Sequence, residues 1–293
     1  MTEHFVAKQL SVVIPTLGRE TLLQTVRSIA SGSVTPAEII VSHQGVPGSM
    51  QAMLPRLKEF GTPIRYVHSN KRGCAAGRNS GVAAVSTRFF ASTDDDCTVS
   101  TGWLQQIATA LELAPKQIVT GQVLSDEAGV PSTIRSDEMR VFTKATLAGV
   151  HFTGGNFGIA LEVFKDVGPF DESELIRFCE DNEWAYRAFA KGYSTRFIPT
   201  VAITHLNWRA ESDVENVYKR YAHSQGGWYG RKLREGDLSF TLRVGYELLR
   251  GAKRWLVGSV KNDSVRRANG RAFVVNLLQG LAAGWKECRG DCL

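Results

Sequence analysis

The first 125 or so residues alternate short β-prone runs with stretches of helical periodicity, and this alternation constrains the fold more than any other feature. The β-prone runs are residues 10–14, 38–42, 64–68, 88–93 and 117–124. Apolar residues at helical spacing lie in 20–31, 50–60 and 75–85 and again after Gly102. Strands that alternate with helical segments of this length form βαβ units with a parallel sheet. We therefore predict an α/β fold with a mostly parallel sheet flanked by helices.

The pattern changes in the second half of the chain. Residues 161–167 and 180–191 have helical spacing, and 195–204 is extended, although Pro199 disfavours a central strand position there. Residues 125–150 have no clear periodicity, so no element is assigned to them. From residue 211 onward the pattern is helical. We predict an α/β domain over residues 1–206 and a basic amphipathic helical region over 207–293.

The two predicted regions differ in charge. Residues 207–293 contain 16 Lys and Arg against 9 Asp and Glu, a net charge of +7, whereas residues 1–206 have a net charge of −1. A basic amphipathic region with Trp and Leu is typical of contact with an anionic surface. We expect peripheral contact with an anionic membrane through these helices. A solvated helical face, or packing on the α/β domain, explains the same pattern.

Cysteine usage and hydropathy limit the compartment. The five cysteines form no CxxC pair and no zinc-ligand spacing, which is typical of free thiols in a reducing compartment. The first eight residues are polar and too short for a signal peptide. No run approaches the roughly 18 apolar residues of a spanning helix. We expect a cytoplasmic protein, with the inner face of the plasma membrane as the surface it would contact.

Three consecutive acids, Asp94, Asp95 and Asp96, follow the β-prone run 89–93 directly. Ligand sites in open α/β sheets lie beyond the carboxyl ends of strands. Adjacent carboxylates repel one another, so a cation is expected beside them. Mg²⁺ or Mn²⁺ held by one or two carboxylates often carries a substrate diphosphate. A solvated acidic turn is the alternative on local sequence alone.

At this point the chain resembles a known family, the family 2 inverting glycosyltransferases, which have the GT-A fold. The resemblance covers roughly residues 10–206, and its segments occur in the family's order. They are 12–16 (VVIPT), 38–41 (EIIV), 73–81 (GCAAGRNSG), 93–96 (TDDD), 154–156 (GGN), and Glu180-Asp181 followed by His205. The resemblance implies metal-dependent transfer of a sugar from a nucleotide-diphosphate sugar, with inversion at the anomeric carbon.

The resemblance also implies roles for individual residues. The acidic triplet matches the family's DxD motif, with its first acids near the donor ribose and its last on the metal. A histidine at the spacing of His205 is a further metal ligand or diphosphate contact, although a histidine that closes a strand is often structural. The implied metal ligands are Asp96, Asp94 and His205, with Mn²⁺ or Mg²⁺ bound. The implied donor-binding residues are Pro15, Thr16, Arg19, Gln44, Arg78, Asp94, Asp95, Gly155 and Asn156.

One departure from the family concerns the nucleobase. The family commonly has one or two acids after the second strand, and here that place reads Ser42-His43-Gln44. Gln44 can donate and accept hydrogen bonds at a pyrimidine edge. His43 is as well explained as an ordinary buried histidine. The choice of base stays open.

Sugar transfer also needs a base for the acceptor hydroxyl. Asp181 is the candidate, with Glu180 as its rival, because both begin a predicted helix whose dipole favours the charged carboxylate. Helix N-terminal capping is the alternative explanation for both acids. The expected acceptor is a carbohydrate, lipid-linked or other hydroxyl, in cell-surface polysaccharide or glycoconjugate synthesis.

Two other functions compete. A metal-dependent nucleotidyltransferase should have a glycine-rich basic loop after the first strand, but residues 16–20 (TLGRE) contain one glycine. A non-catalytic basic module would bind nucleic acid through the tail in a salt-sensitive way. The tail aromatics lie at helical core spacing and not as stacking platforms, so no nucleic-acid partner is expected.

Overall fold

The computed structural model describes residues 5–126, 136–147, 149–206 and 214–287. The chain divides into two compact units. The first comprises Met1–Ala145, Gly149–Phe170 and Trp184–Trp208, and the second comprises Thr146–Ala148, Asp171–Glu183 and Arg209–Leu293. The boundary predicted between residues 206 and 207 falls beside 207–213, which lie outside the described residues.

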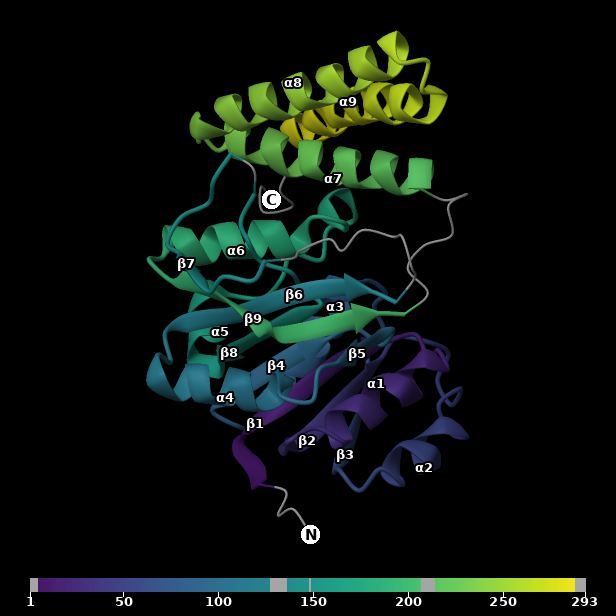
Figure 1. Ribbon diagram of the computed structural model, residues 1–293, viewed down its shortest axis with the longest axis vertical. Coiled ribbons are helices and arrows are strands. Elements are labelled where there is room, and N and C mark those ends of the chain that lie inside the picture. The colour runs from purple at the N-terminus through teal and green to yellow at the C-terminus, as the bar shows by residue number, and fades with distance from the viewer. Residues whose placement is uncertain (1–4, 127–135, 148, 207–213, 288–293) are drawn as a thin grey trace, which may run out of the picture. The chain divides into compact units, whose positions relative to one another are not determined.

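The first unit is built on a nine-stranded sheet with the order β3-β2-β1-β4-β8-β6-β9-β5, and β7 pairs with β9 (Figure 1). The strands are β1 (Phe5–Thr16), β2 (Val34–His43), β3 (Ile64–His68), β4 (Phe89–Thr93), β5 (Cys97–Val99), β6 (Gln117–Ser125), β7 (Arg140–Phe142), β8 (Asn156–Ala160) and β9 (Ser194–His205). Among these strands, β1, β2, β3, β4, β6 and β9 run in one direction. The prediction of a mostly parallel sheet is confirmed.

Helices cover both faces of this sheet. The helices in this part of the chain are α1 (Thr21–Ala30), α2 (Met53–Lys58), α3 (Cys74–Ala83), α4 (Trp103–Leu113), α5 (Leu161–Val167) and α6 (Glu180–Ala190), of which α6 begins in the second unit. An added Cβ at Gly158 of β8 would lie 2.2 Å from Ile107 of α4, and one at Gly81 of α3 would lie 2.4 Å from Val13 of β1. Val12, and not Val13, is in register with Ala91 and Gly158. Because neighbouring residues of a strand point to opposite faces, α4 and α3 lie on opposite sides. Figure 1 shows α1 and α4 in front of the strands.

Three strands run against the others and were not predicted. β8 pairs antiparallel with β4 and β6, while β5 and β7 pair antiparallel with β9. β5 and β7 have only three residues each, too short for a periodic signal. β7 lies in the stretch 125–150, where the sequence assigned no element, and residues 127–135 of that stretch are outside the described residues.

Pro199 lies in an interior strand, contrary to expectation. β9 pairs with β6, β5 and β7. The ladder with β6 is interrupted where Pro199 falls, because Gly121 pairs with Ile198 and Gln122 pairs with Ala202. A bulge removes the need for the missing N–H of proline. Gln122 also donates its Nε2 to the Pro199 carbonyl at 3.0 Å.

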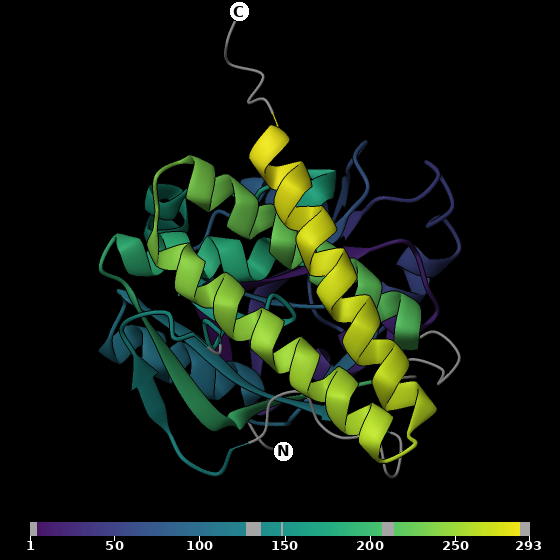
Figure 2. The same ribbon diagram turned by 90° about the horizontal axis from the view of Figure 1, so that it is seen from above.

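The second unit is helical, as predicted for the C-terminal region. It contains a short 3₁₀ turn at Glu174–Ile176 and the helices α7 (Val214–Arg234), α8 (Ser239–Val260) and α9 (Ser264–Lys286). The helices α7 and α9 cross at glycines: an added Cβ at Gly226 or Gly280 would lie 2.1 or 2.0 Å from a backbone oxygen of the partner helix. Likewise, an added Cβ at Gly258 of α8 would lie 2.4 Å from a backbone nitrogen of α9. Figure 2 shows α8 and α9 converging toward the turn that joins them.

Candidate active site

The candidate site lies at one edge of the sheet in the first unit. The parallel strands β1, β2, β4 and β9 all end there. β8 runs the opposite way and begins there, with Asn156 paired to Thr93. Cys97 of β5 pairs with His205 of β9. The topology therefore brings the acidic triplet, the 154–155 glycines and His205 together from four strands.

Asp94 forms an ion pair with a buried arginine. The Arg78 Nη2 atom donates to Asp94 Oδ1 at 2.7 Å, and the Arg78 side chain is only 4% exposed. Two glycines enclose this pair, because an added Cβ at Gly155 would lie 2.6 Å from Asp94 Oδ2, and one at Gly154 would lie 2.7 Å from Arg78 Nη1. Both positions need glycine for this close approach. Gly155 thus lies against the carboxylate that the sequence assigned to donor and metal.

Asp95 is held by the first strand. The Thr16 hydroxyl donates to Asp95 Oδ2 at 2.6 Å and accepts the Gly18 N–H at 2.9 Å. Burial raises the pKa of the Asp95 carboxyl, although the hydrogen bond from Thr16 opposes this. Thr16, one of the donor-binding residues implied by the resemblance, therefore uses its hydroxyl to orient Asp95.

Asp96 directs its two oxygens toward different partners. Arg19 donates from Nη1 to Asp96 Oδ2 at 2.9 Å. On the other oxygen, Oδ1, His205 Nε2 lies at 3.5 Å and the Cys97 thiol at 3.8 Å. Burial raises the pKa of the Asp96 carboxyl, and His205 opposes that rise. The chain itself thus supplies cationic neighbours for the acidic triplet.

The donor atoms around Asp96 fit a divalent ion. Ligand atoms of Asp96, Cys97 and His205 lie within 4.8 Å of one another. Two atoms 3.5 Å apart, as Asp96 Oδ1 and His205 Nε2 are, can both reach one ion at the usual distance of about 2.1 Å. Burial raises the pKa of the Cys97 thiol far above its usual range, which disfavours the thiolate that metals bind. A carboxylate and an imidazole remain, a pair that suits Mn²⁺ better than Mg²⁺.

Asn156 does not reach the candidate site with its side chain. Its Oδ1 accepts the Trp103 indole N–H at 2.8 Å, and its Nδ2 donates to the Gln122 and Val201 carbonyls, both at 3.0 Å. The residue is fully buried. These three hydrogen bonds tie α4, β6 and β9 together, so the Asn156 side chain has a core role, and donor binding by this residue stays a prediction.

Gln44 and Pro15 also serve packing. Gln44 Nε2 donates to the carbonyls of Lys71 and Gly73 at 2.9 and 2.7 Å, which uses both amide hydrogens. Gln44 therefore holds the loop before α3 and has no side-chain N–H left for a base edge. Pro15 is buried, and an added Cβ at Gly77 would lie 2.8 Å from its Cβ. Direct donor contact by Pro15, or by the Gln44 side-chain oxygen, stays a prediction.

His43 agrees with its interpretation as an ordinary buried histidine. Its Nδ1 lies 3.0 Å from the Tyr66 hydroxyl and its Nε2 lies 3.2 Å from the Ser49 hydroxyl. Burial lowers the pKa of His43, and His68 lowers it further. A neutral imidazole with both nitrogens bonded has no remaining polar atom for a ligand.

Glu180 and Asp181 belong to the second unit, at the start of α6. Glu180 is 6% exposed and Asp181 is half-buried. Asp181 Oδ1 accepts the backbone N–H of Asn182 at 2.7 Å and its side-chain amide at 3.0 Å. Their role as base stays a prediction.

Sequence reasoning missed Cys97 as a neighbour of the site, whereas Gly154 stands in the segment 154–156 that matches the family. Cys97 directly follows the acidic triplet, but only the register of β5 with β9 shows that it faces His205. The closeness of Gly154 to Arg78 could not be seen in the sequence, because it depends on β8 beginning beside the end of β4.

Residues 11–170 match the family Glycosyl transferase family 2, which is more than half of the chain. The chain belongs to this family. Among characterised proteins, it is 30% identical over 149 residues to the Pre-mycofactocin glycosyltransferase of Mycobacterium tuberculosis, which covers 47% of this chain and 31% of the relative. It is 24% identical over 230 residues to the Chondroitin synthase of Pasteurella multocida, which covers 64% of this chain and 24% of the relative. The chain thus spans about a third or less of these relatives.

Solved structures share the fold. The mannosyltransferase PcManGT of Pyrobaculum calidifontis, solved with GDP-Man and Mn²⁺, matches with a TM-score of 0.61 and 13% identity, over 92% of this chain and 87% of that protein. At this identity the match shows the fold alone, and it confirms the predicted GT-A architecture.

Proposed function

We propose that the protein transfers a sugar from a nucleotide-diphosphate sugar to an acceptor hydroxyl, with inversion at the anomeric carbon. The carrying observation is the cluster at the end of β4, where three acids meet Arg19, Arg78, Gly155 and His205. The family membership supports this chemistry, and the mannosyltransferase of similar fold was solved with a nucleotide sugar and Mn²⁺. A carbohydrate or lipid-linked acceptor in polysaccharide or glycoconjugate synthesis is the acceptor class that we propose.

Within this proposal Asp96 and His205, with Asp94, hold Mn²⁺ or Mg²⁺. The ion, when bound, supplies the Lewis acid that neutralises charge on the leaving diphosphate. Arg78 holds Asp94 in place from a nearly buried position. Arg19 has a side chain that is 55% exposed, so its guanidinium can turn from Asp96 toward a diphosphate oxygen. Guanidinium groups bind phosphate oxygens through paired N–H donors.

Asp181 is our candidate for the base that takes the proton of the acceptor hydroxyl, and Glu180 is its rival. Asp181 stands in the first turn of α6, where the helix dipole favours a carboxylate. Inversion needs only one such base, because the acceptor displaces the diphosphate in a single step. Asp181→Asn should retain donor binding and lose transfer, whereas Glu180→Gln should retain both. The opposite result would assign the base to Glu180.

The metal assignment is tested by thermal unfolding with a panel of nucleotide sugars and Mn²⁺. A donor that binds the folded protein raises Tm by mass action. Asp96→Ala should abolish the metal-dependent rise in Tm and the transfer of sugar. Glu59→Ala removes an exposed acid of the same unit and should change neither. If Asp96→Ala transfers sugar at the normal rate, the metal assignment is wrong.

We also propose that α8 contacts an anionic membrane. The helices of the second unit meet through glycines, which leaves large apolar side chains on outer faces. Leu242, Leu249, Leu256 and Val260 of α8 are 69%, 74%, 64% and 85% exposed. They recur every four to seven residues along one side, opposite the buried Glu247, Gly251 and Gly258. Helix contacts through small residues with large apolar groups outside are typical of lipid surroundings.

Positive charge accompanies this apolar face. Lys253 and Lys261 are exposed on or beside it, and Arg250 is 46% exposed. No helix in the described part of the chain has both the length and the apolar character needed to cross a bilayer. An apolar face with basic flanks fits a helix that lies in the interface plane.

Sedimentation with vesicles tests this contact. The wild-type protein should sediment with phosphatidylglycerol vesicles, and the double variant Leu249→Glu, Leu256→Glu should not. Leu113→Glu changes a leucine of α4 that is 76% exposed and serves as the matched control. If the wild type stays in solution but forms a dimer that the double variant lacks, the face belongs to a second copy of the chain and the membrane proposal is wrong.

A further inference from the structure

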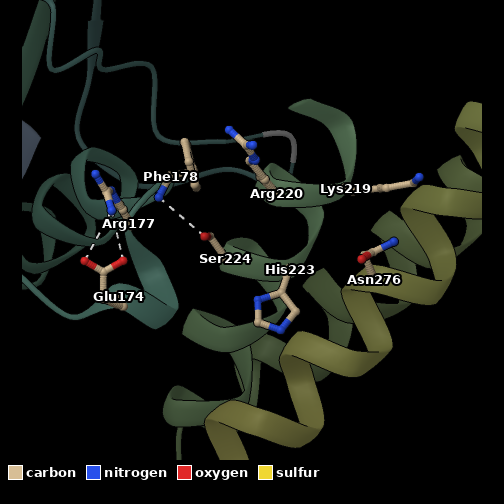
Figure 3. Close-up of a pocket in the computed structure, with 8 residues that line it drawn as sticks. All are labelled: Glu174, Arg177, Phe178, Lys219, Arg220, His223, Ser224 and Asn276. Carbon is tan, nitrogen blue, oxygen red and sulfur yellow. Dashed lines mark hydrogen bonds and ion pairs between the residues drawn. The ribbon is translucent and has the colours of Figure 1, made fainter. Parts of the chain in front are cut away.

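A cavity of 550 Å³ lies within the second unit (Figure 3). It is lined by the segment around the 3₁₀ turn, by one side of α7 and by a single residue of α9. The lining residues are Glu174, Arg177, Phe178, Lys219, Arg220, His223, Ser224 and Asn276. This volume lies within the usual range for small-molecule sites, roughly 300–1,000 Å³. None of these residues has a role in the proposed sugar transfer.

The lining carries an excess of positive charge. Arg177, Lys219 and Arg220 are cations, and Glu174 is the single acid among the eight lining residues. Arg177 Nη1 pairs with Glu174 at 3.1 Å, so the acid is neutralised from within the cavity wall. In addition to this ion pair, Lys219 and Arg220 line the same cavity.

The remaining groups fix the shape of the cavity. The guanidinium of Arg220 lies 5.9 Å from the centre of the Phe178 ring, a cation–π contact that holds it at the rim. The buried Ser224 hydroxyl accepts the Phe178 N–H at 3.4 Å. Asn276 donates its Nδ2 to the Ala272 carbonyl at 2.7 Å. Figure 3 shows Ser224 between Arg177 and Arg220, with Lys219 farther along α7 and its ammonium directed away from both guanidinium groups.

We infer that this cavity binds a phosphate or diphosphate group carried by a small-molecule ligand. Guanidinium groups bind phosphoryl oxygens in pairs, and an ammonium group adds a point charge. A phosphate alone would leave much of the volume unfilled, so the ligand bears a further group beside the Phe178 ring. The inference does not depend on sugar transfer. A phosphorylated sugar and a polyprenyl diphosphate offer the same anionic chemistry.

Calorimetric titration of the full chain with inorganic pyrophosphate, in EDTA, tests the inference. Without a divalent ion the acids Asp94, Asp95 and Asp96 disfavour an anion in the first unit, so the titration reports on the second. Arg177→Gln with Arg220→Gln should weaken binding about tenfold or more, since charged hydrogen bonds are lost. Arg267→Gln with Arg271→Gln removes the same charge from exposed sites on α9 and should have no such effect.

One further variant should strengthen pyrophosphate binding where the double arginine variant weakens it. Glu174→Gln removes the opposing carboxylate and should tighten pyrophosphate binding. Wild-type protein that binds no pyrophosphate, or a double arginine variant that binds it as well as the wild type, would overturn the inference. Two more titrations distinguish the ligand classes. Geranyl diphosphate that binds more tightly than pyrophosphate indicates a lipid diphosphate. Glucose 1-phosphate that binds more tightly than pyrophosphate indicates a soluble sugar phosphate. These readouts need neither metal nor donor, so their failure is distinct from failure of the transferase proposal.

Discussion

Adding one methyl group at Gly155 should loosen the donor site without unfolding the protein. The added Cβ would lie 2.6 Å from Asp94 Oδ2 and 3.3 Å from Asp94 Cγ. Carbon and carbonyl-type oxygen atoms approach to about 3.3 Å, so the carboxylate must withdraw by about 0.7 Å. Arg78 holds the other oxygen at 2.7 Å, so this withdrawal stretches or breaks their hydrogen bond. Hydrogen bonds to charged groups contribute about 1.5–3 kcal/mol.

We therefore expect Gly155→Ala to weaken metal-dependent donor binding roughly tenfold to a hundredfold. The unfolding free energy should fall by about 1.5–3 kcal/mol, because the hydrogen bond from the buried Arg78 to Asp94 is weakened or lost in the folded state. Donor affinity is measured by titration with the nucleotide sugar that raises Tm most. Gly102→Ala is the matched control, since its Cβ would meet only Gln106 at 4.0 Å. Wild-type donor affinity in Gly155→Ala would refute the role of Asp94.

Three further predictions concern stability. Asn156→Ala should cost about 2–4 kcal/mol of unfolding free energy, because it leaves the Trp103 N–H and two carbonyls unpaired in the core; denaturant unfolding measures this. Burial raises the pKa of Glu247, so the folded state holds this proton more tightly, and wild-type stability falls as pH rises from about 4.3 through the raised pKa. Glu247→Gln should lack this fall, so its Tm relative to wild type should rise with pH. Gly245→Ala, in the interior of α8 with no atom within 4 Å of its Cβ, should raise unfolding free energy by about 0.5–1 kcal/mol.

The elements that the sequence revealed are those with local patterns. The runs 10–14, 38–42 and 64–68 all fall within the observed strands β1, β2 and β3. β5 and β7 were not predicted because each has only three residues, and both pair with β9, far along the chain. Even Pro199 was informative, since it marks where the ladder breaks.

The site residues were harder to predict from sequence than the strands, because a polar side chain near the site can point toward the site or into the core. Asp94, Asp95 and Asp96 face cations, as mutual repulsion required. Asn156 and Gln44 turn to core carbonyls, and nothing local distinguishes these two outcomes. The deciding partners, such as Trp103 for Asn156, come from elements that only the folded sheet brings near.

The arrangement around Asp96 is compatible with the proposal that one carboxylate serves both donor and metal. Its Oδ2 is engaged by Arg19, and its Oδ1 faces His205. Arg19 is therefore not an obstacle to an ion on the histidine side, because the two partners use different oxygens. Asp95 contributes to this separation, since Thr16 fixes its Oδ2 while its Oδ1 lies 3.7 Å from Arg19. Because Arg19 is shared between Asp95 and Asp96, it is bound less tightly to each of them. It can therefore move to a phosphate oxygen while Asp96 keeps its orientation.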